Sequence, residues 1–169
     1  NNSLLTLPDG RPLFWFQRLI GMKDASHIRG LDFMKKICES SERKHIKIGI
    51  YGCSSKSILI KLCSKLTELY PKLKISYAFS PPFRKLNKVE NIEVLKNINK
   101  SNIEILFVGL GCPKQETWMY KNYKNTNCVM IGVGAAFDFF VGRKKTAPKF
   151  LSIIGLEWFY RFLEEPVRL

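Results

Sequence analysis

Two glycine-rich turns that follow apolar runs are the part of this chain best suited to hold a phosphorylated ligand. The first apolar run leads into Gly109-Leu-Gly111, and the second leads into Gly132-Val-Gly134. Glycine lets the backbone approach a ligand closely, and free N–H groups at the start of a following helix bind phosphate without a metal ion. We therefore interpret both turns as candidate phosphate-binding turns, with a tight strand-to-helix connection as the alternative.

Polar side chains with useful chemistry follow both turns. Gln115 and Glu116 lie in the first turn of the helix expected after Gly111, where the helix dipole stabilises a carboxylate with or without a ligand. We expect Gln115 to contact the ligand and leave capping and ligand contact equally open for Glu116. Asp138 follows the second apolar strand near its carboxyl end. A hydrogen bond to a ribose or sugar hydroxyl and a turn-forming role both fit this residue.

Cations near these turns suit the binding of a diphosphate. The run Arg143-Lys-Lys145 lies in the same part of the chain, and Arg161 and Arg168 follow it. Guanidinium and ammonium groups can neutralise a diphosphate in place of a divalent ion. Arg161 also stands four residues after Glu157, so an ion pair along a helix is its alternative role. The sequence contains no Asp-x-Asp pair and no C-x-x-C pair, and we expect no metal site.

Alternating strands and helices position these turns. The residue pattern predicts strands at 46–51, 73–78, 103–108 and 128–133, and helices at 56–70, 87–100 and 113–122. This alternation implies parallel pairing with right-handed crossovers, which is an α/β fold with a Rossmann-like layered sheet and flanking helices. Ligands bind beyond the carboxyl ends of such strands, where both glycine turns fall. Residues 7–16 form a turn that opens into an apolar run, and we expect one domain over 1–169.

The charge of the chain favours anionic partners. Its 169 residues include 28 Lys and Arg against 14 Asp and Glu, for a net charge of +14, which attracts phosphates in nucleic acid, anionic lipid or nucleotide-linked metabolites. Solvated surface charge is the alternative for each scattered cluster. No nucleic-acid reader motif is present, and the aromatic residues follow apolar periodicity instead of alternating with Lys and Arg, so we expect no nucleic-acid partner. Five cysteines without a signal peptide fit a reducing cytoplasm.

Taken in order, the motifs of this chain resemble those of the WecG/TagA/CpsF family of bacterial glycosyltransferases. The resemblance covers nearly the whole chain, and its Pro-Asp-Gly-x-Pro-Leu form looks most like the capsule and exopolysaccharide members. The matching residues are Pro8-Asp9-Gly10, Pro12-Leu13, Trp15, Arg18, Gly21, Gly30, Asp32, Tyr70-Pro71, 109–116, 132–138, Gly142, Ala147-Pro148, 155–158, Arg161, Glu165-Pro166 and Arg168.

The resemblance implies an enzyme of cell-surface polysaccharide biosynthesis. Family members add N-acetylmannosamine-type sugars to lipid-linked intermediates. We therefore expect inverting, metal-independent transfer of an N-acetylhexosamine-type sugar from a UDP donor to an undecaprenyl diphosphate-linked sugar, with no further cofactor. We expect the protein to lie peripherally at the inner face of the cytoplasmic membrane, where anionic lipid attracts Lys and Arg. The longest apolar run, at 128–141, is interrupted by Asp138 and is too short to span a bilayer.

The resemblance also implies roles for residues near the start of the chain. Asp9 matches the family aspartate that removes the proton of the acceptor hydroxyl, although an Asp before Gly can also simply form a turn through its side chain. Arg18 and His27 are candidate second contacts near Asp9. His27 stands where many members of the family carry Arg.

The family pattern extends beyond both ends of this sequence. Members begin with an earlier strand region that contributes to the active site and continue past Arg168 into a basic tail, and we expect this chain to lack both. The alternative function is therefore a truncated, inactive fragment that binds a nucleotide sugar or a partner subunit. A monomer and a homo-oligomer are both compatible with the sequence.

Overall fold

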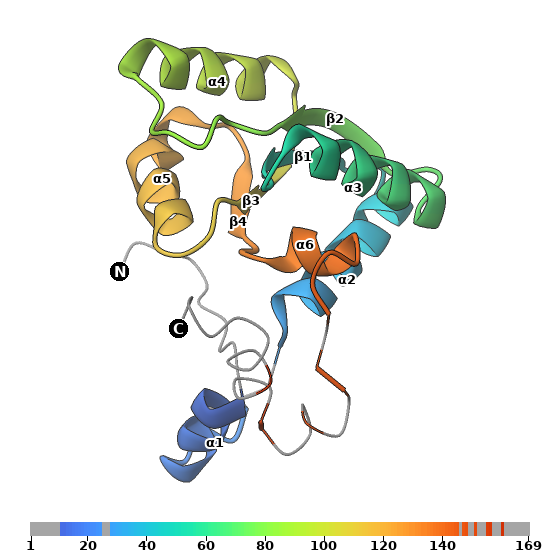
Figure 1. Cartoon of the computed structure of the whole chain (residues 1–169), viewed down its shortest axis with the longest axis vertical. Helices are drawn as coiled ribbons and strands as arrows, with labels where there is room; N and C mark the ends of the chain where they lie inside the picture. The colour runs from blue at the N-terminus through green and yellow to red at the C-terminus, as the bar shows by residue number, and fades with distance from the viewer. Residues whose placement is uncertain are drawn as a thin grey trace.

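Four parallel strands lie at the centre of the structure, which is a computed structural model. It describes residues 11–24, 28–145, 147, 148, 151, 155, 156 and 160. The strands pair in the order β2-β1-β3-β4, with every pairing parallel (Figure 1). Their bounds are β1 (Lys47–Gly52), β2 (Lys74–Phe79), β3 (Ile105–Gly109) and β4 (Val129–Gly132). The predicted α/β fold with a parallel layered sheet is confirmed.

Two apolar clusters, one on each face of the sheet, form the core. On β1, Ile48 and Ile50 belong to the first cluster and Tyr51 to the second, whereas on β3 Phe107 belongs to the first and Leu106 to the second. Successive side chains of a strand point to opposite faces, so each central strand contributes to both clusters. All five side chains are essentially buried, which explains why these strands read as almost continuous apolar runs.

Helices cover both faces of the sheet. The first cluster packs against α2 (Gly30–Lys44), α3 (Lys56–Leu69) and α6 (Ala136–Phe140). The second packs against α4 (Lys88–Lys100) and α5 (Lys114–Asn122), which is followed by the 3-10 helix η1 (Tyr123–Asn125). Side chains define two of the helix starts. Ser55 accepts a hydrogen bond from the N–H of Ile58 at α3, and Asn87 and Glu90 form a reciprocal capping box at α4.

The order of the strands fixes where a ligand can enter. The chain passes from β1 through α3 to β2 on one side, then returns through α4 to β3 on the other side of β1. The direction of strand addition therefore reverses between β1 and β3. In open α/β sheets, ligands bind in the crevice outside the carboxyl ends of the strands at such a switch point. In this chain these ends are Gly52 and Gly109.

The structure differs from the sequence-based prediction most at the beginning of the chain. The apolar run expected after a turn is the helix α1 (Arg11–Leu19), and α2 was not predicted. Pro113, which was expected in the first turn of a helix, is the residue immediately before α5. The predicted bounds of the four strands and of α3, α4 and α5 agree with the structure to within two residues.

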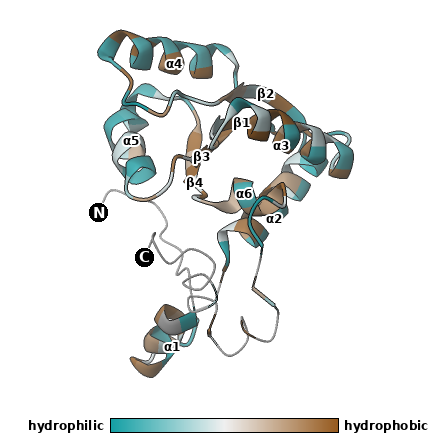
Figure 2. Cartoon of the chain, in the orientation of Figure 1, coloured by the Kyte–Doolittle hydropathy of each residue, from teal (hydrophilic) through white to brown (hydrophobic). Residues whose placement is uncertain are grey.

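The helix α1 lies apart from the three layers (Figure 1). Its apolar side chains Leu13, Phe16 and Leu19 are exposed, and Figure 2 shows apolar residues along it. The indole of Trp15 contacts Gly155, where an added Cβ would lie 2.3 Å from the ring. None of the described helices is both long and apolar enough to cross a membrane.

Candidate functional site

A cavity of about 1510 Å³ opens at the carboxyl ends of β1 and β3. Its walls are the turns after both strands, the loop between β2 and α4, one side of α5 and the segment around α6. The cavity lies at the switch point of the sheet, as the strand order requires. It is larger than the roughly 300–1,000 Å³ of a typical small-molecule pocket, so it has room for a ligand as long as a nucleotide sugar.

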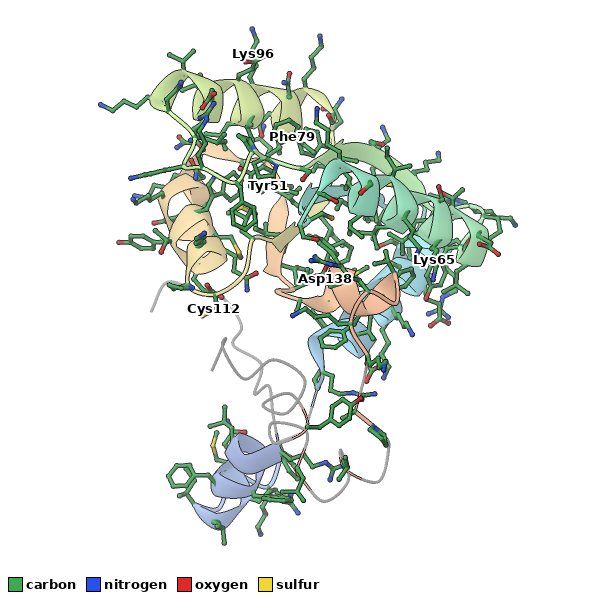
Figure 3. All side chains as sticks on the ribbon, in the orientation of Figure 1. Tyr51, Lys65, Phe79, Lys96, Cys112 and Asp138 are labelled. Atoms are coloured by element: carbon green, nitrogen blue, oxygen red, sulfur yellow. The ribbon has the colours of Figure 1, made fainter. Side chains whose placement is uncertain are left out.

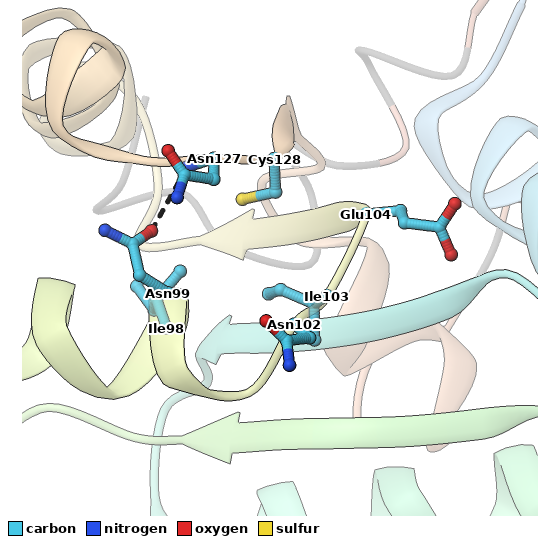
Figure 4. A pocket seen from close by; sticks show the side chains of 7 residues that line it. All are labelled: Ile98, Asn99, Asn102, Ile103, Glu104, Asn127 and Cys128. Carbon is cyan, nitrogen blue, oxygen red and sulfur yellow. Dashed lines mark hydrogen bonds between the residues drawn. The ribbon is translucent and has the colours of Figure 1, made fainter.

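A second cavity, of about 230 Å³, lies at the opposite ends of the strands (Figure 4). Asn99 there accepts a hydrogen bond from the N–H of Asn127 and donates one to the carbonyl of Asn125. Glu104 accepts a hydrogen bond from the N–H of Lys47. These polar groups hold the amino ends of the strands together, and we assign them no ligand.

The two glycine turns lie where the sequence predicted them, since Gly109 is the last residue of β3 and Gly132 the last of β4. Gly109 is packed so tightly that an added Cβ would lie 2.4 Å from the ring of Phe137. An added Cβ on Gly52 would lie 2.4 Å from the carbonyl oxygen of Gly109. Glycine at 52 and 109 therefore lets the ends of β1 and β3 meet at the floor of the cavity.

Gln115 follows the first glycine turn in the chain, and its side chain is hydrogen-bonded to the second. Its side chain is buried, its Oε1 accepts a hydrogen bond of 3.0 Å from the N–H of Gly134, and its Nε2 donates one of 2.8 Å to Glu116. An added Cβ on Gly132 would lie 3.1 Å from the same Nε2. Gln115 thus sets the spacing of the turns. Its expected contact with a ligand stays a prediction, as does that of the exposed Glu116.

Asp138, labelled in Figure 3, joins the turn after β1 to the segment after α6. One carboxylate oxygen, Oδ1, accepts hydrogen bonds from Ser54 Oγ at 3.1 Å and from Arg143 Nη1 at 3.3 Å. The backbone N–H of Arg143 donates to the carbonyl of Asp138, which closes the turn after α6. Asp138 was expected near the end of a strand, and it lies within α6, the short helix after β4. Its side chain lines the cavity and is 18% exposed.

Cys53 and Ser54 line the cavity but were not singled out from the sequence. Their turn follows the same strand-turn-helix pattern as the two glycine turns, which is the signal that could have identified them. Burial, with a smaller contribution from the Asp138 carboxylate, raises the pKa of the Cys53 thiol to about 12. Cys53 is therefore a protonated wall residue at neutral pH and not a nucleophile.

Aromatic and amide side chains hold together the wall of the cavity that α4 and α5 form. Trp118 Nε1 donates a hydrogen bond to Asn91, whose amide donates to Asn122, and Asn122 donates back to the carbonyl of Trp118. The Trp118 ring lies 4.4 Å, centroid to centroid, from that of Tyr51, which is labelled in Figure 3. Burial raises the pKa of Tyr51 to about 12, which keeps its phenol neutral. This network fixes α4 and α5 against β1.

The cavity lining is strongly cationic. Asp138 is the single carboxylate among its described residues, against Lys and Arg side chains that come from the β2–α4 loop, the start of α4, α5 and the segment after α6. These cations are Arg84, Lys85, Lys88, Lys114, Lys121, Arg143 and Lys144. A low-dielectric cleft lined by one sign of charge concentrates ligands of the other sign. The cavity therefore suits an anion such as a diphosphate.

The structure brings only part of the predicted site together. Gly109, Gly111, Gly134, Asp138 and Arg143 line the cavity, and Gly132, Gln115 and Glu116 lie next to these turns. Arg18 is on α1, where it donates to the carbonyl of Lys23, and it does not line the cavity. Asp9, His27 and Arg161 lie outside the described residues.

Comparison of the sequence with known proteins identifies a family and several relatives. The model of the Glycosyl transferase WecG/TagA/CpsF family matches residues 1–169. An N-acetylglucosaminyldiphosphoundecaprenol N-acetyl-beta-D-mannosaminyltransferase of Bacillus subtilis (strain 168) is 33% identical over 99% of the chain. Proteins of the same name from Bacillus spizizenii (strain ATCC 23059 / NRRL B-14472 / W23) and Staphylococcus aureus (strain MW2) are 31% and 30% identical over 96% and 100% of it.

The chain spans 64%, 61% and 65% of the lengths of these three curated relatives. The matched part includes the strands, both glycine turns and every described residue of the cavity. The chain thus belongs to the WecG/TagA/CpsF family of glycosyltransferases.

Proposed function

We propose that the cavity at the switch point binds the UDP-sugar donor of a glycosyltransferase. The observation that carries this proposal is the cationic lining around two glycine turns in a chain of this family. The relatives are named for transfer of N-acetylmannosamine to N-acetylglucosaminyldiphosphoundecaprenol. The proposed reaction is accordingly transfer of an N-acetylhexosamine-type sugar from UDP to an undecaprenyl diphosphate-linked sugar in cell-surface polysaccharide biosynthesis.

The diphosphate of the donor would bind without a divalent ion. Backbone N–H groups around Gly111 and at the start of α5 supply hydrogen-bond donors, and Arg143 and Lys144 supply positive charge. Asp138 Oδ1 is already hydrogen-bonded to Ser54 and Arg143. In this proposal the other carboxylate oxygen, Oδ2, accepts a hydrogen bond from a ribose or sugar hydroxyl.

The transfer itself requires a base and stabilisation of the leaving group. In the proposed mechanism Asp9 removes the proton of the acceptor hydroxyl as that oxygen bonds to the anomeric carbon of the donor sugar. The bond from this carbon to the diphosphate oxygen breaks, and its electron pair leaves with UDP. Attack opposite the leaving group inverts the anomeric centre. The cations of the cavity stabilise the charge that develops on the diphosphate.

The lipid part of the acceptor would place the protein at a membrane surface. With a net charge of +14, the chain is attracted to an anionic leaflet, and each Lys or Arg near the surface contributes about 1 kcal/mol. The proposed location is the inner face of the bacterial cytoplasmic membrane, with peripheral attachment.

A transfer assay tests this function. The purified chain would receive UDP-N-acetylmannosamine and a lipid diphosphate N-acetylglucosamine analogue in the presence of EDTA, with UDP release and the disaccharide product measured. We expect transfer that EDTA does not diminish and that Asp9→Asn abolishes. UDP release no faster than that of Asp9→Asn contradicts the catalytic proposal. Saturable UDP binding without transfer would instead identify a nucleotide-sugar-binding function.

A further inference from the structure

An exposed aromatic ring stands in the wall of the cavity. Phe83 is 92% exposed, yet it is one of the residues that line the cavity. Phe is a large apolar side chain that normally contributes its area to a core or an interface. The Phe83 ring packs into neither apolar cluster of the sheet, so its area is available to a ligand.

The loop that carries Phe83 is anchored on both sides. Before it, Ser80 Oγ donates a hydrogen bond of 3.4 Å to the carbonyl of Cys53, in the turn after β1. After it, Arg84 donates two hydrogen bonds, of 2.8 and 2.5 Å, to the carboxylate of Glu90 on α4. Glu90 also caps α4 through Asn87. Pro81 and Pro82 further restrict the backbone between these anchors.

The surroundings of the ring indicate what kind of ligand it would meet. Lys114 Nζ lies 5.5 Å from the centroid of the Phe83 ring, a cation–π contact. Lys85, Lys88 and Lys121 line the same cavity. An aromatic platform beside cations fits a ligand that joins a planar ring to phosphates. A nucleotide has this composition, whereas a lipid diphosphate has the phosphates but no planar ring to stack.

We propose that Phe83 is the stacking platform for the base of the nucleotide donor. This inference rests on the proposed function and adds where the base lies: on the β2–α4 loop, with the diphosphate between it and the glycine turns. Stacking uses the face that every base presents, so Phe83 contributes affinity without selecting uracil. The affinity of a ligand that has the diphosphate but no base would not depend on the Phe83 ring.

Binding measurements on UDP and on inorganic pyrophosphate test this placement. Phe83→Ala is expected to weaken UDP binding about 5- to 150-fold, the equivalent of about 1–3 kcal/mol for loss of one aromatic–base stack. Its affinity for pyrophosphate is expected to stay unchanged. Phe83→Tyr and Phe83→Trp keep an aromatic face and should bind UDP at least as tightly as the parent. Tyr120→Ala, which removes an exposed aromatic ring outside the cavity, is the matched control.

The outcomes separate this inference from the proposed function. Unchanged UDP affinity of Phe83→Ala overturns the stacking role while leaving donor binding intact. Equal losses for UDP and pyrophosphate also overturn it, because the loop would then hold the diphosphate. If the unaltered chain shows no saturable UDP binding, the proposed function and the stacking role fail together. Because Phe83 is exposed, we expect Phe83→Ala to unfold at the same temperature as the parent.

Discussion

The hydroxyl of Ser54 donates a hydrogen bond of 3.1 Å to Asp138 Oδ1, although the two residues lie 84 positions apart in the chain. Ser54 belongs to the turn after β1, and Asp138 belongs to α6 beyond β4. The contact exists because the strand order brings both segments to one end of the sheet. Ser54 and Arg143 together hold one carboxylate oxygen, Oδ1, of a side chain that lines the cavity.

Ser54→Ala should therefore weaken nucleotide binding without unfolding the protein. A hydrogen bond of this kind contributes about 0.5–1.5 kcal/mol, so we expect the Kd for UDP to rise by about two- to tenfold. Ser54→Thr keeps the hydroxyl and should restore most of the affinity. Ser57→Ala is the matched control, because Ser57 is exposed on α3 and does not line the cavity. Equal UDP affinities of the parent and Ser54→Ala, measured by calorimetry, would exclude a positioning role.

Gln115→Ala should lower the stability of the protein. The substitution leaves the N–H of Gly134 without its acceptor and removes a buried side chain between the two glycine turns. Loss of a hydrogen bond costs about 0.5–1.5 kcal/mol, and we expect the free energy of unfolding to fall by at least this amount in urea denaturation. Glu116→Gln keeps an oxygen for Gln115 Nε2 to bond and serves as the control. Parent-like stability of Gln115→Ala would show that the turns do not depend on this bond.

The five cysteines should differ in their reaction with iodoacetamide at pH 8. Burial raises the pKa of Cys53 to about 12, so only about one thiol in ten thousand is ionised at that pH, and the thiolate is the reactive form. Cys112 is exposed and should be modified first. Because the pKa of Cys53 is raised, its labelling rate should still increase with each step in pH up to about 12. Labelling is followed by peptide mass spectrometry. If Cys53 were labelled as fast as Cys112, the conclusion that the Cys53 thiol is buried and protonated would be wrong.

The sequence pattern was sufficient to predict the strands and the glycine turns, because each of them depends on a local pattern of residues. Apolar runs of strand length and helices of 3.6-residue period locate β1, β3, α3 and α4 within two residues. The buried face of α2 carries Met34, Cys38 and Ser41, and two of these residues give a weak apolar signal. That helix was consequently missed, even though the spacing of these three residues is helical.

Contacts between distant segments could not be predicted in the same way. The pairing of Ser54 with Asp138 depends on β1 and β3 being neighbours, and strand order is not a property of any local pattern. Gln115 was expected to contact a ligand, but its bond to Gly134 becomes visible only once β3 and β4 are placed side by side. Phe83 lies in the loop between β2 and α4, and only the cavity gives it a role.

The nucleotide donor is proposed to bind at the carboxyl ends of β1 and β3. The most direct measurement is a titration of the ¹⁵N-labelled chain with UDP, followed by the backbone amide signals of each residue. We predict saturable shifts at Ser54, Gly111, Gly134 and Asp138, and none at Asn127 in the small cavity at the other end of the strands. Saturable shifts confined to the amino ends of the strands, or no shifts at the glycine turns at saturating UDP, would contradict the account.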